Sequence, residues 1–214
     1  LRVGIAYTRG RAIMPRLIPA FQREYPNVEV TLREGTNDAI QKALLNGGID
    51  LAIAAYPKSP PDIELADYYT EHIVLCLADS LLSQCRFDLD AHRSEIAEGD
   101  LHSLRGCPFV LGSAADVGGR IGRELLRTSG VSPVSKATSE NVETLLALCV
   151  QGVGACFCPE NLLQTALSPE QLAQLHILPL CPGASYPICF AHLKRSYPWS
   201  VLSEFIRIAR DQIK

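Results

Sequence analysis

The chain has 214 residues, of which 47% are hydrophobic and 20% are charged, and its formal net charge is −3. This composition is typical of an ordinary globular protein with a buried core, and the negative charge argues against a surface that neutralises nucleic-acid phosphates. No apolar run approaches the roughly 20 residues needed to cross a bilayer. Leu1 begins directly in a strand, so we expect a cytoplasmic protein without membrane contact, or a fragment trimmed of whatever preceded it.

The first 54 residues predict a β-α-β-α-β unit. The expected elements are a strand at 1–6, a helix around 13–21, a strand at 28–32, a helix at 36–46 and a strand at 49–54. Tyr7-Thr8-Arg9-Gly10 is expected to form a turn after the first strand. Gly47-Gly48 is expected to end the second helix, because glycine commonly follows a helix C-terminus.

The same order and spacing return about a hundred residues later. A strand pair at 65–69 and 72–77 is expected first, followed by a surface loop with a short helix at 83–103. The second copy then comprises a strand at 108–111, a helix at 117–128, a strand at 134–138, a helix at 141–151 and a strand at 152–157. Ile5 to Leu111 is 106 positions, and so is Val28 to Val134. A duplicated unit of this kind implies two lobes with a cleft between them.

The remaining residues predict a helix that begins at Ser168-Pro169-Glu170-Gln171, strands at 175–180 and 186–193, and a final amphipathic helix around 201–209. The final helix has no partner in the second copy, so we expect it to return to the first lobe. Alternating helices and apolar strands indicate an α/β fold with largely parallel sheets.

The eight cysteines form no C-x-x-C pair, which excludes zinc-ribbon and thioredoxin motifs. Most lie inside apolar strand or helix patterns, where a thiol packs as a small hydrophobic group. The cysteines in such patterns are Cys76, Cys149, Cys156, Cys158 and Cys189. Cys156 and Cys158 point to the same face of their strand, and a redox pair there is an alternative without further support in the sequence.

Catalytic motifs are missing from the sequence. There is no G-x-S-x-G, H-E-x-x-H or Walker motif, and Gly152-Val153-Gly154 precedes a strand instead of following one. The five histidines are scattered without ligand spacing. We therefore expect no enzyme activity, no cofactor and no metal.

Two runs of sequence carry a family resemblance. LRVGIAYTRGRAIMPRLIPAFQREYPNVEVTLREGTNDAIQKALLNGGIDLAIA and ATSENVETLLALCVQGVGACFCPENLL resemble the two halves of the effector-binding domain of LysR-type transcriptional regulators. The resemblance implies a fold like type 2 periplasmic binding proteins, with two Rossmann-like lobes joined by a two-stranded hinge. The lobes would comprise residues 1–77 plus 181–214, and residues 78–180.

The resemblance also implies function and partners. A small effector, such as a carboxylate or another small anion, would bind in the interlobe cleft and control DNA binding by a winged helix-turn-helix domain that this chain lacks. The implied assembly is a homodimer, with a tetramer as a further option for the full-length protein. A stand-alone solute-binding protein and an enzyme of the same fold are the alternatives.

Candidate effector contacts lie at the carboxyl ends of the predicted strands, where helix N-termini present N–H groups to anions. Family members contact the effector at positions that match Thr8, Thr36 and the loop of Ala55 and Tyr56. In the second lobe the matching positions are Ser113 and 117–119. Because Ala55 stands where some members place an arginine, Arg9, Arg11 or Arg120 would supply the positive charge. The complete candidate set is Thr8, Arg9, Thr36, Asn37, Tyr56, Ser113, Val117, Gly118, Gly119 and Arg120.

Each candidate has a purely structural alternative. Thr8, Thr36 and Asn141 are good helix caps, and Gly118-Gly119 suits a tight turn that needs positive φ. Arg11 is preferred as a surface charge, and the Tyr56 ring could simply pack against its loop. Peroxide-sensing members carry their reactive cysteine pair in the stretch that matches 113–127, where this chain has none. The resemblance therefore predicts no regulatory intramolecular disulfide.

Overall fold

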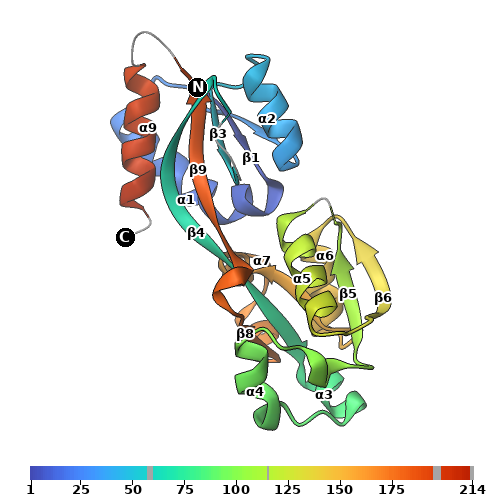
Figure 1. The fold of residues 1–214 in the computed structure, drawn as a ribbon. Coiled ribbons are helices and arrows are strands. Elements are labelled where there is room, and N and C mark those ends of the chain that lie inside the picture. Colours follow the sequence, from blue (N-terminus) through green and yellow to red (C-terminus); the bar gives the residue numbers. More distant parts are fainter. Residues whose placement is uncertain (57–59, 115, 195–198, 213–214) are drawn as a thin grey trace. The chain divides into compact units, whose positions relative to one another are not determined.

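The computed structural model describes residues 1–56, 60–114, 116–194 and 199–212, and the chain divides into two compact units (Figure 1). Unit 1 comprises Leu1–Thr70 and Tyr186–Lys214, and unit 2 comprises Glu71–Ser185. The chain passes from unit 1 to unit 2 within strand β4 (Ile63–Ala78) and returns at the start of strand β9 (Ser185–Leu193). The change of unit therefore falls inside continuous strands.

Unit 1 contains the first predicted β-α-β-α-β unit. Its elements are β1 (Arg2–Ile5), α1 (Tyr7–Glu24), β2 (Thr31–Glu34), α2 (Asn37–Leu45), β3 (Leu51–Ala54), the first part of β4, β9 and α9 (Ser200–Asp211). The strand order is β2-β1-β3-β9-β4. β1 is parallel to β2 and β3, whereas β9 is antiparallel to β3. The sheet is therefore mixed and not largely parallel, because the returning C-terminal strand joins it.

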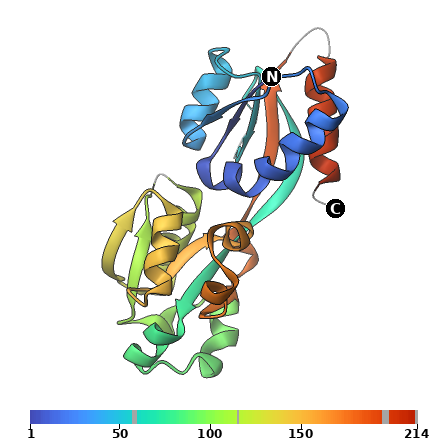
Figure 2. The ribbon, with the colours of Figure 1, turned by 180° about the vertical axis from the view of Figure 1, so that it is seen from behind.

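Helices cover both faces of the unit 1 sheet, as expected for buried apolar strands. On one face α1 and α9 lie side by side (Figure 2), and the rings of Phe21 and Phe205 meet edge to face with centroids 5.1 Å apart. Leu51 and Ile53 of β3 join this cluster. The alternate residues of β3 face the other way, into a cluster with Ile40 and Leu44 of α2. Each fully buried leucine, isoleucine or phenylalanine contributes about 1.5–3 kcal/mol relative to an exposed side chain.

Unit 2 contains the second predicted copy and several further elements. Its elements are the second part of β4, α3 (Asp79–Cys85), α4 (Leu89–Ala97), η1 (His102–Leu104), β5 (Pro108–Gly112), α5 (Val117–Thr128), β6 (Val134–Ser139), α6 (Val142–Val150), β7 (Cys156–Pro159), α7 (Glu160–Ala166), α8 (Pro169–Leu172), β8 (Leu175–Pro179) and η2 (Pro182–Ala184). β5 is parallel to β6, and a parallel bridge joins Phe109 to Ala155 just before β7. β7 and β8 are both antiparallel to β4.

Several sequence expectations are wrong in detail. The second strand begins at Thr31 and not at Val28, because hydrogen bonding to the first strand starts where the Thr31 N–H donates to Leu1. The expected strand pair at 65–77 is one continuous strand, in which the buried Glu71 accepts a hydrogen bond from Asn161. The polar stretch 83–103 is mostly helical, with Asp88 as the N-cap of α4.

Other local signals are confirmed. Ser168 and Gln171 form the predicted capping box of α8. Gly47 follows α2 with a φ of 68°, a left-handed conformation that favours glycine. Within the described ranges, no helix has both the length and the hydropathy to cross a membrane.

Candidate functional site

The carboxyl ends of β1, β2 and β3 meet at one edge of the unit 1 sheet, and two helices begin there. α1 starts at Tyr7, so the predicted turn at 7–10 is wrong: these residues form the first helical turn. The N-cap is Ala6, which has no side chain that accepts a hydrogen bond, and no acidic residue lies in the first turn. Thr8 lies inside the helix and is not its cap. The helix therefore presents an uncapped N-terminus, which carries a partial positive charge.

Arg9 brings a full positive charge to the same edge. Its side chain is buried, with 4% exposure, and Nη1 donates a hydrogen bond to the carbonyl oxygen of Ile53 at 3.4 Å. The carboxyl group of Glu34 also lies here, because a Cβ atom built on Gly10 would be 2.7 Å from its Oε1. Arg11, by contrast, is exposed. Of the two arginines on α1 that the sequence offered, Arg9 is therefore the one at the strand ends.

α2 begins at the same edge and carries two candidates. Thr36 is its N-cap, and Oγ1 accepts a hydrogen bond from the Ala39 N–H at 3.2 Å, which confirms the structural alternative for this residue. Accepting this bond leaves the hydroxyl hydrogen available for another acceptor. Asn37 is the first helical residue, and its Oδ1 is buried with no hydrogen-bond partner among the described residues.

Tyr56 follows β3 and is buried, with 6% exposure. Its ring packs with Ile40 of α2, as the structural alternative proposed. Its hydroxyl oxygen, however, is buried without a hydrogen-bond partner among the described residues. Burial, and to a lesser extent Cys189, raises the pKa of Tyr56 to about 12, so the phenol is a neutral donor.

The unpartnered atoms of Asn37 and Tyr56 are informative because buried polar groups are nearly always satisfied. Leaving one unsatisfied costs about 1–3 kcal/mol unless water or a ligand supplies a partner. The sequence predicted both positions, but only the structure shows that these atoms lack partners. Tyr7, the first residue of the predicted turn at 7–10, is 65% exposed at the start of α1.

In unit 2 the start of α5 differs from the prediction. Asp116 is the N-cap, and its Oδ2 accepts a hydrogen bond from the Gly119 N–H at 3.0 Å. The N–H group that was expected to face an anion is therefore bonded to a carboxylate of the chain itself. The sequence signal was an aspartate three residues before Gly119, a common capping position. Val117 and Ser113 are half-buried and Arg120 is exposed.

The two glycines of α5 are needed for packing and not for backbone conformation. Neither has a positive φ, so the tight-turn alternative is wrong. A Cβ atom on Gly119 would lie 2.3 Å from the carbonyl oxygen of Ser113, and one on Gly118 would lie 3.1 Å from Ile73 Cδ1. Gly119 therefore lets α5 approach the end of β5 closely, and Gly118 leaves room for Ile73 of β4. At the start of α6, Asn141 accepts from the Glu143 N–H at 2.9 Å, which confirms it as a cap.

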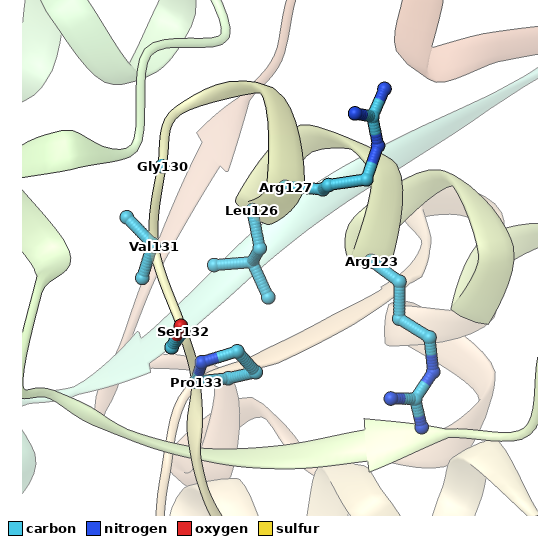
Figure 3. Close-up of a pocket in the computed structure, with 7 residues that line it drawn as sticks. All are labelled: Arg123, Leu126, Arg127, Gly130, Val131, Ser132 and Pro133. Carbon is cyan, nitrogen blue, oxygen red and sulfur yellow. The ribbon is translucent and has the colours of Figure 1, made fainter.

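A hollow of about 410 Å³ lies on unit 2 away from all predicted site residues (Figure 3). Its lining residues are Arg123, Leu126, Arg127, Gly130, Val131, Ser132 and Pro133. The guanidinium groups of Arg123 and Arg127 point away from each other in Figure 3. Arg127 is paired with Glu124 at 2.6 Å, and Arg123 donates to the carbonyl oxygen of Gly112 at 2.9 Å. The hollow therefore does not concentrate positive charge on one ligand position.

Comparison with known proteins identifies the family. Residues 1–214 match the model of the LysR substrate binding domain. The chain is 25% identical over 162 residues to the transcriptional dual regulator GltC of Bacillus subtilis, a match that covers 75% of this chain and 51% of GltC. The chain thus spans about half the length of the curated relatives it matches.

Solved structures agree on the fold. The chain resembles the regulatory domain of CcmR from Synechocystis PCC6803, with a TM-score of 0.78, 17% identity, and coverage of 100% of this chain and 97% of that one. It also resembles the effector binding domain of QuiR, with a TM-score of 0.71, 19% identity, and coverage of 99% and 95%. The fold is therefore the two-lobe, periplasmic-binding-protein-like fold of LysR regulatory domains, and the family is regulatory and not enzymatic. The chain belongs to the LysR substrate binding domain family.

Proposed function

We propose that this chain senses a small anionic effector for a LysR-type transcriptional regulator and binds it at the carboxyl ends of the strands. One observation carries the proposal: the sheet edge of unit 1 combines the uncapped N-terminus of α1, the buried guanidinium of Arg9 and two buried polar atoms without partners, on Asn37 and Tyr56. Helix N-termini and guanidinium groups favour anions. The anion would accept a hydrogen bond from the Tyr56 hydroxyl, and a hydroxyl group of the effector would donate one to Asn37 Oδ1.

The proposed contacts in unit 1 are Thr8, Arg9, Thr36, Asn37 and Tyr56. Thr36 can donate its hydroxyl hydrogen to the effector while its oxygen remains the cap of α2.

In unit 2 the proposed contacts are Ser113, Val117, Gly118 and Arg120. Gly119 serves packing instead, because its N–H is already bonded to Asp116.

Two relatives support a small acid as the effector class. The CcmR regulatory domain is described in complex with 2-PG, and the QuiR domain in complex with shikimate. Both are small, polar and anionic compounds, which matches the charge and the hydrogen-bonding groups at the strand ends.

The chain spans about half of the relatives' length, so we propose that a winged helix-turn-helix domain elsewhere in the full-length protein binds DNA. The full-length protein would act in the cytoplasm, and the chain would form an isologous homodimer. Sedimentation at tens of micromolar is expected to give a dimer, and a strict monomer would contradict this assembly.

A thermal-shift screen tests the effector class. Small carboxylic and phosphorylated acids, including shikimate and 2-PG, are each compared with a neutral analogue such as the methyl ester. An effector at a hundred times its Kd stabilises the folded chain by about 2.7 kcal/mol. We expect at least one acid to raise Tm while its neutral analogue does not.

Two variants locate the acid. Arg9→Gln is expected to abolish the acid-dependent increase in Tm, whereas Arg11→Gln, at an exposed position on the same helix, is expected to retain it. Equal stabilisation by acid and neutral analogue, or an unchanged increase in Arg9→Gln, would contradict the proposal.

A further inference from the structure

Four thiols gather in the core of unit 2. Cys76 comes from β4, Cys149 from α6, and Cys156 and Cys158 from β7, and all four are fully buried. The sulfur atoms of Cys76 and Cys158 are 3.6 Å apart. The Cys149 thiol donates to the carbonyl oxygen of Cys76 at 3.3 Å. Two segments that are distant in sequence, β4 and the α6–β7 segment, therefore bring nucleophilic side chains into contact.

The strand register places Cys76 opposite Cys156, whereas Cys158 is opposite Val74. β4 and β7 are antiparallel, and Cys76 is the direct cross-strand partner of Cys156. Cys158 lies two residues further along, on the same face of the strand. Directly opposed residues in an antiparallel pair have Cα atoms about 4.5–5.5 Å apart, which lies within the range that a disulfide spans. A bond from Cys76 to Cys156 therefore requires little backbone movement, whereas Cys158 is the diagonal neighbour whose sulfur lies 3.6 Å from that of Cys76.

Two other readings of the thiols are weaker. Among the residues that the structure describes, no group of three or more side chains is arranged to hold a metal ion. The pair Cys85 and Cys107 lies nearer the surface, but burial and the neighbouring Cys85 raise the pKa of Cys107 to about 12, which keeps that thiol protonated. A protonated thiol is a poor nucleophile toward a peroxide, so Cys107 would not be the first sulfur to react.

We propose that Cys76 forms a reversible intramolecular disulfide with one of the two β7 thiols when the protein meets a peroxide. The Cys76 sulfur attacks one peroxide oxygen and breaks the O–O bond, which gives a sulfenic acid and, after proton transfer, one water. The β7 thiol then attacks the Cys76 sulfur, the S–O bond breaks, and a second water leaves. In total, two thiols lose two electrons and two protons, and hydrogen peroxide becomes two water molecules.

The electrostatics of the cluster support Cys76 as the attacking sulfur. Hydrogen bonds from Cys156 and Cys158 hold the pKa of Cys76 well below its usual range, although burial opposes this effect, whereas the pKa values of Cys156 and Cys158 are raised. Cys76 is therefore the sulfur that reacts with the peroxide, and a β7 thiol reacts second. The proposal revises the expectation that no intramolecular disulfide forms. That expectation rested on the absence of cysteines from 113–127 and on the apolar surroundings of the other cysteines, and it could not include contacts between β4 and β7.

The test uses the reduced 214-residue chain, freed of reductant and treated with a small excess of hydrogen peroxide. Remaining thiols are blocked with iodoacetamide under denaturing conditions, and non-reduced peptides are mapped by mass spectrometry. We expect the number of free thiols to fall from eight to six, with Cys76 linked to Cys156 or Cys158, and dithiothreitol to restore all eight. The link closes a long loop, so oxidation should also raise Tm.

Variants separate this pair from general oxidation. Cys76→Ala is expected to keep its remaining thiols reduced, whereas Cys149→Ala, equally buried in the same cluster, is expected to form the link. If Cys76→Ala does not fold, isotope-labelled alkylation of the wild-type chain reads the oxidation of Cys76 directly. Eight free thiols after peroxide, a link between Cys85 and Cys107, or a link between chains would overturn the proposal. None of these outcomes bears on effector binding, which is tested separately.

Discussion

Replacing Tyr56 by phenylalanine separates the packing of this residue from its proposed role in binding. The variant keeps the ring in its core and removes the buried hydroxyl that has no partner among the described residues. Because an unsatisfied buried polar atom costs about 1–3 kcal/mol, the free energy of unfolding of the ligand-free chain should rise by about 1 kcal/mol. For a domain of this size that corresponds to an increase in Tm of roughly 2–4 °C.

Effector affinity should change in the opposite direction. If the Tyr56 hydroxyl donates to the anion, its loss removes a hydrogen bond to a charged group, which costs roughly 1.5–3 kcal/mol, or on the order of 10- to 150-fold in Kd. Calorimetric titration with the most stabilising acid of the screen measures this change. A variant that becomes more stable and binds more weakly at the same time would identify the hydroxyl as a binding group.

The pH dependence gives a second readout. Burial raises the pKa of Tyr56 to about 12, above the value of about 10 in an unfolded chain. Between these two values the unfolded chain loses this proton and the folded chain keeps it, so stability falls as pH rises. Tyr56→Phe should therefore weaken the alkaline loss of stability between about pH 10 and 12, as measured by thermal melts.

Tyr68→Phe is the matched control. The Tyr68 hydroxyl is also buried without a partner among the described residues, and burial also raises its pKa. Its ring, however, packs on Phe190, with centroids 4.2 Å apart, on the face of the sheet that α1 and α9 cover. This variant should gain stability without losing affinity. Unchanged affinity in Tyr56→Phe, or an equal loss in both variants, would refute the assignment.

Three further predictions follow from individual contacts. Thr36→Val should cost about 1 kcal/mol of stability through the lost cap and weaken effector binding by roughly 10-fold or more. Thr36→Ser should retain both stability and affinity. Unchanged effector affinity in Thr36→Val would show that Thr36 is a helix cap only. Burial raises the pKa of Asp50, but hydrogen bonds from Arg2 outweigh burial and hold the pKa below its usual value. The Arg2–Asp50 pair therefore stabilises the fold above about pH 4, and this stabilisation is lost as pH falls through the lowered pKa. Acid titration followed by circular dichroism should show a weaker acid transition in Asp50→Asn, together with lower stability at neutral pH. Gly119→Ala should destabilise the fold by about 1–3 kcal/mol in denaturant unfolding, because its Cβ would lie 2.3 Å from the Ser113 carbonyl oxygen; a neutral effect would show that α5 can shift.

Local patterns in the sequence determined much of the architecture. The helix at 117–128, the N-caps Thr36 and Ser168, and the stop at Gly47 were all predictable, because each depends on residues within one or two helical turns. The repeated β-α-β-α-β order was predictable for the same reason, since side-chain period separates helices from strands. The carboxyl ends of the strands, and hence the candidate residues of unit 1, follow from that order.

Tertiary structure decided what depends on partners distant in the chain. Glu71 is buried within β4, and its carboxylate accepts a hydrogen bond from Asn161, 90 residues away. β9 makes the sheet mixed because it returns beside β3. The burial of Arg9, the unpartnered hydroxyl of Tyr56 and the contact between Cys76 and β7 likewise arise from packing between separate elements. A sequence pattern records the side-chain period of one element, whereas burial and hydrogen-bond satisfaction depend on which other elements pack against it.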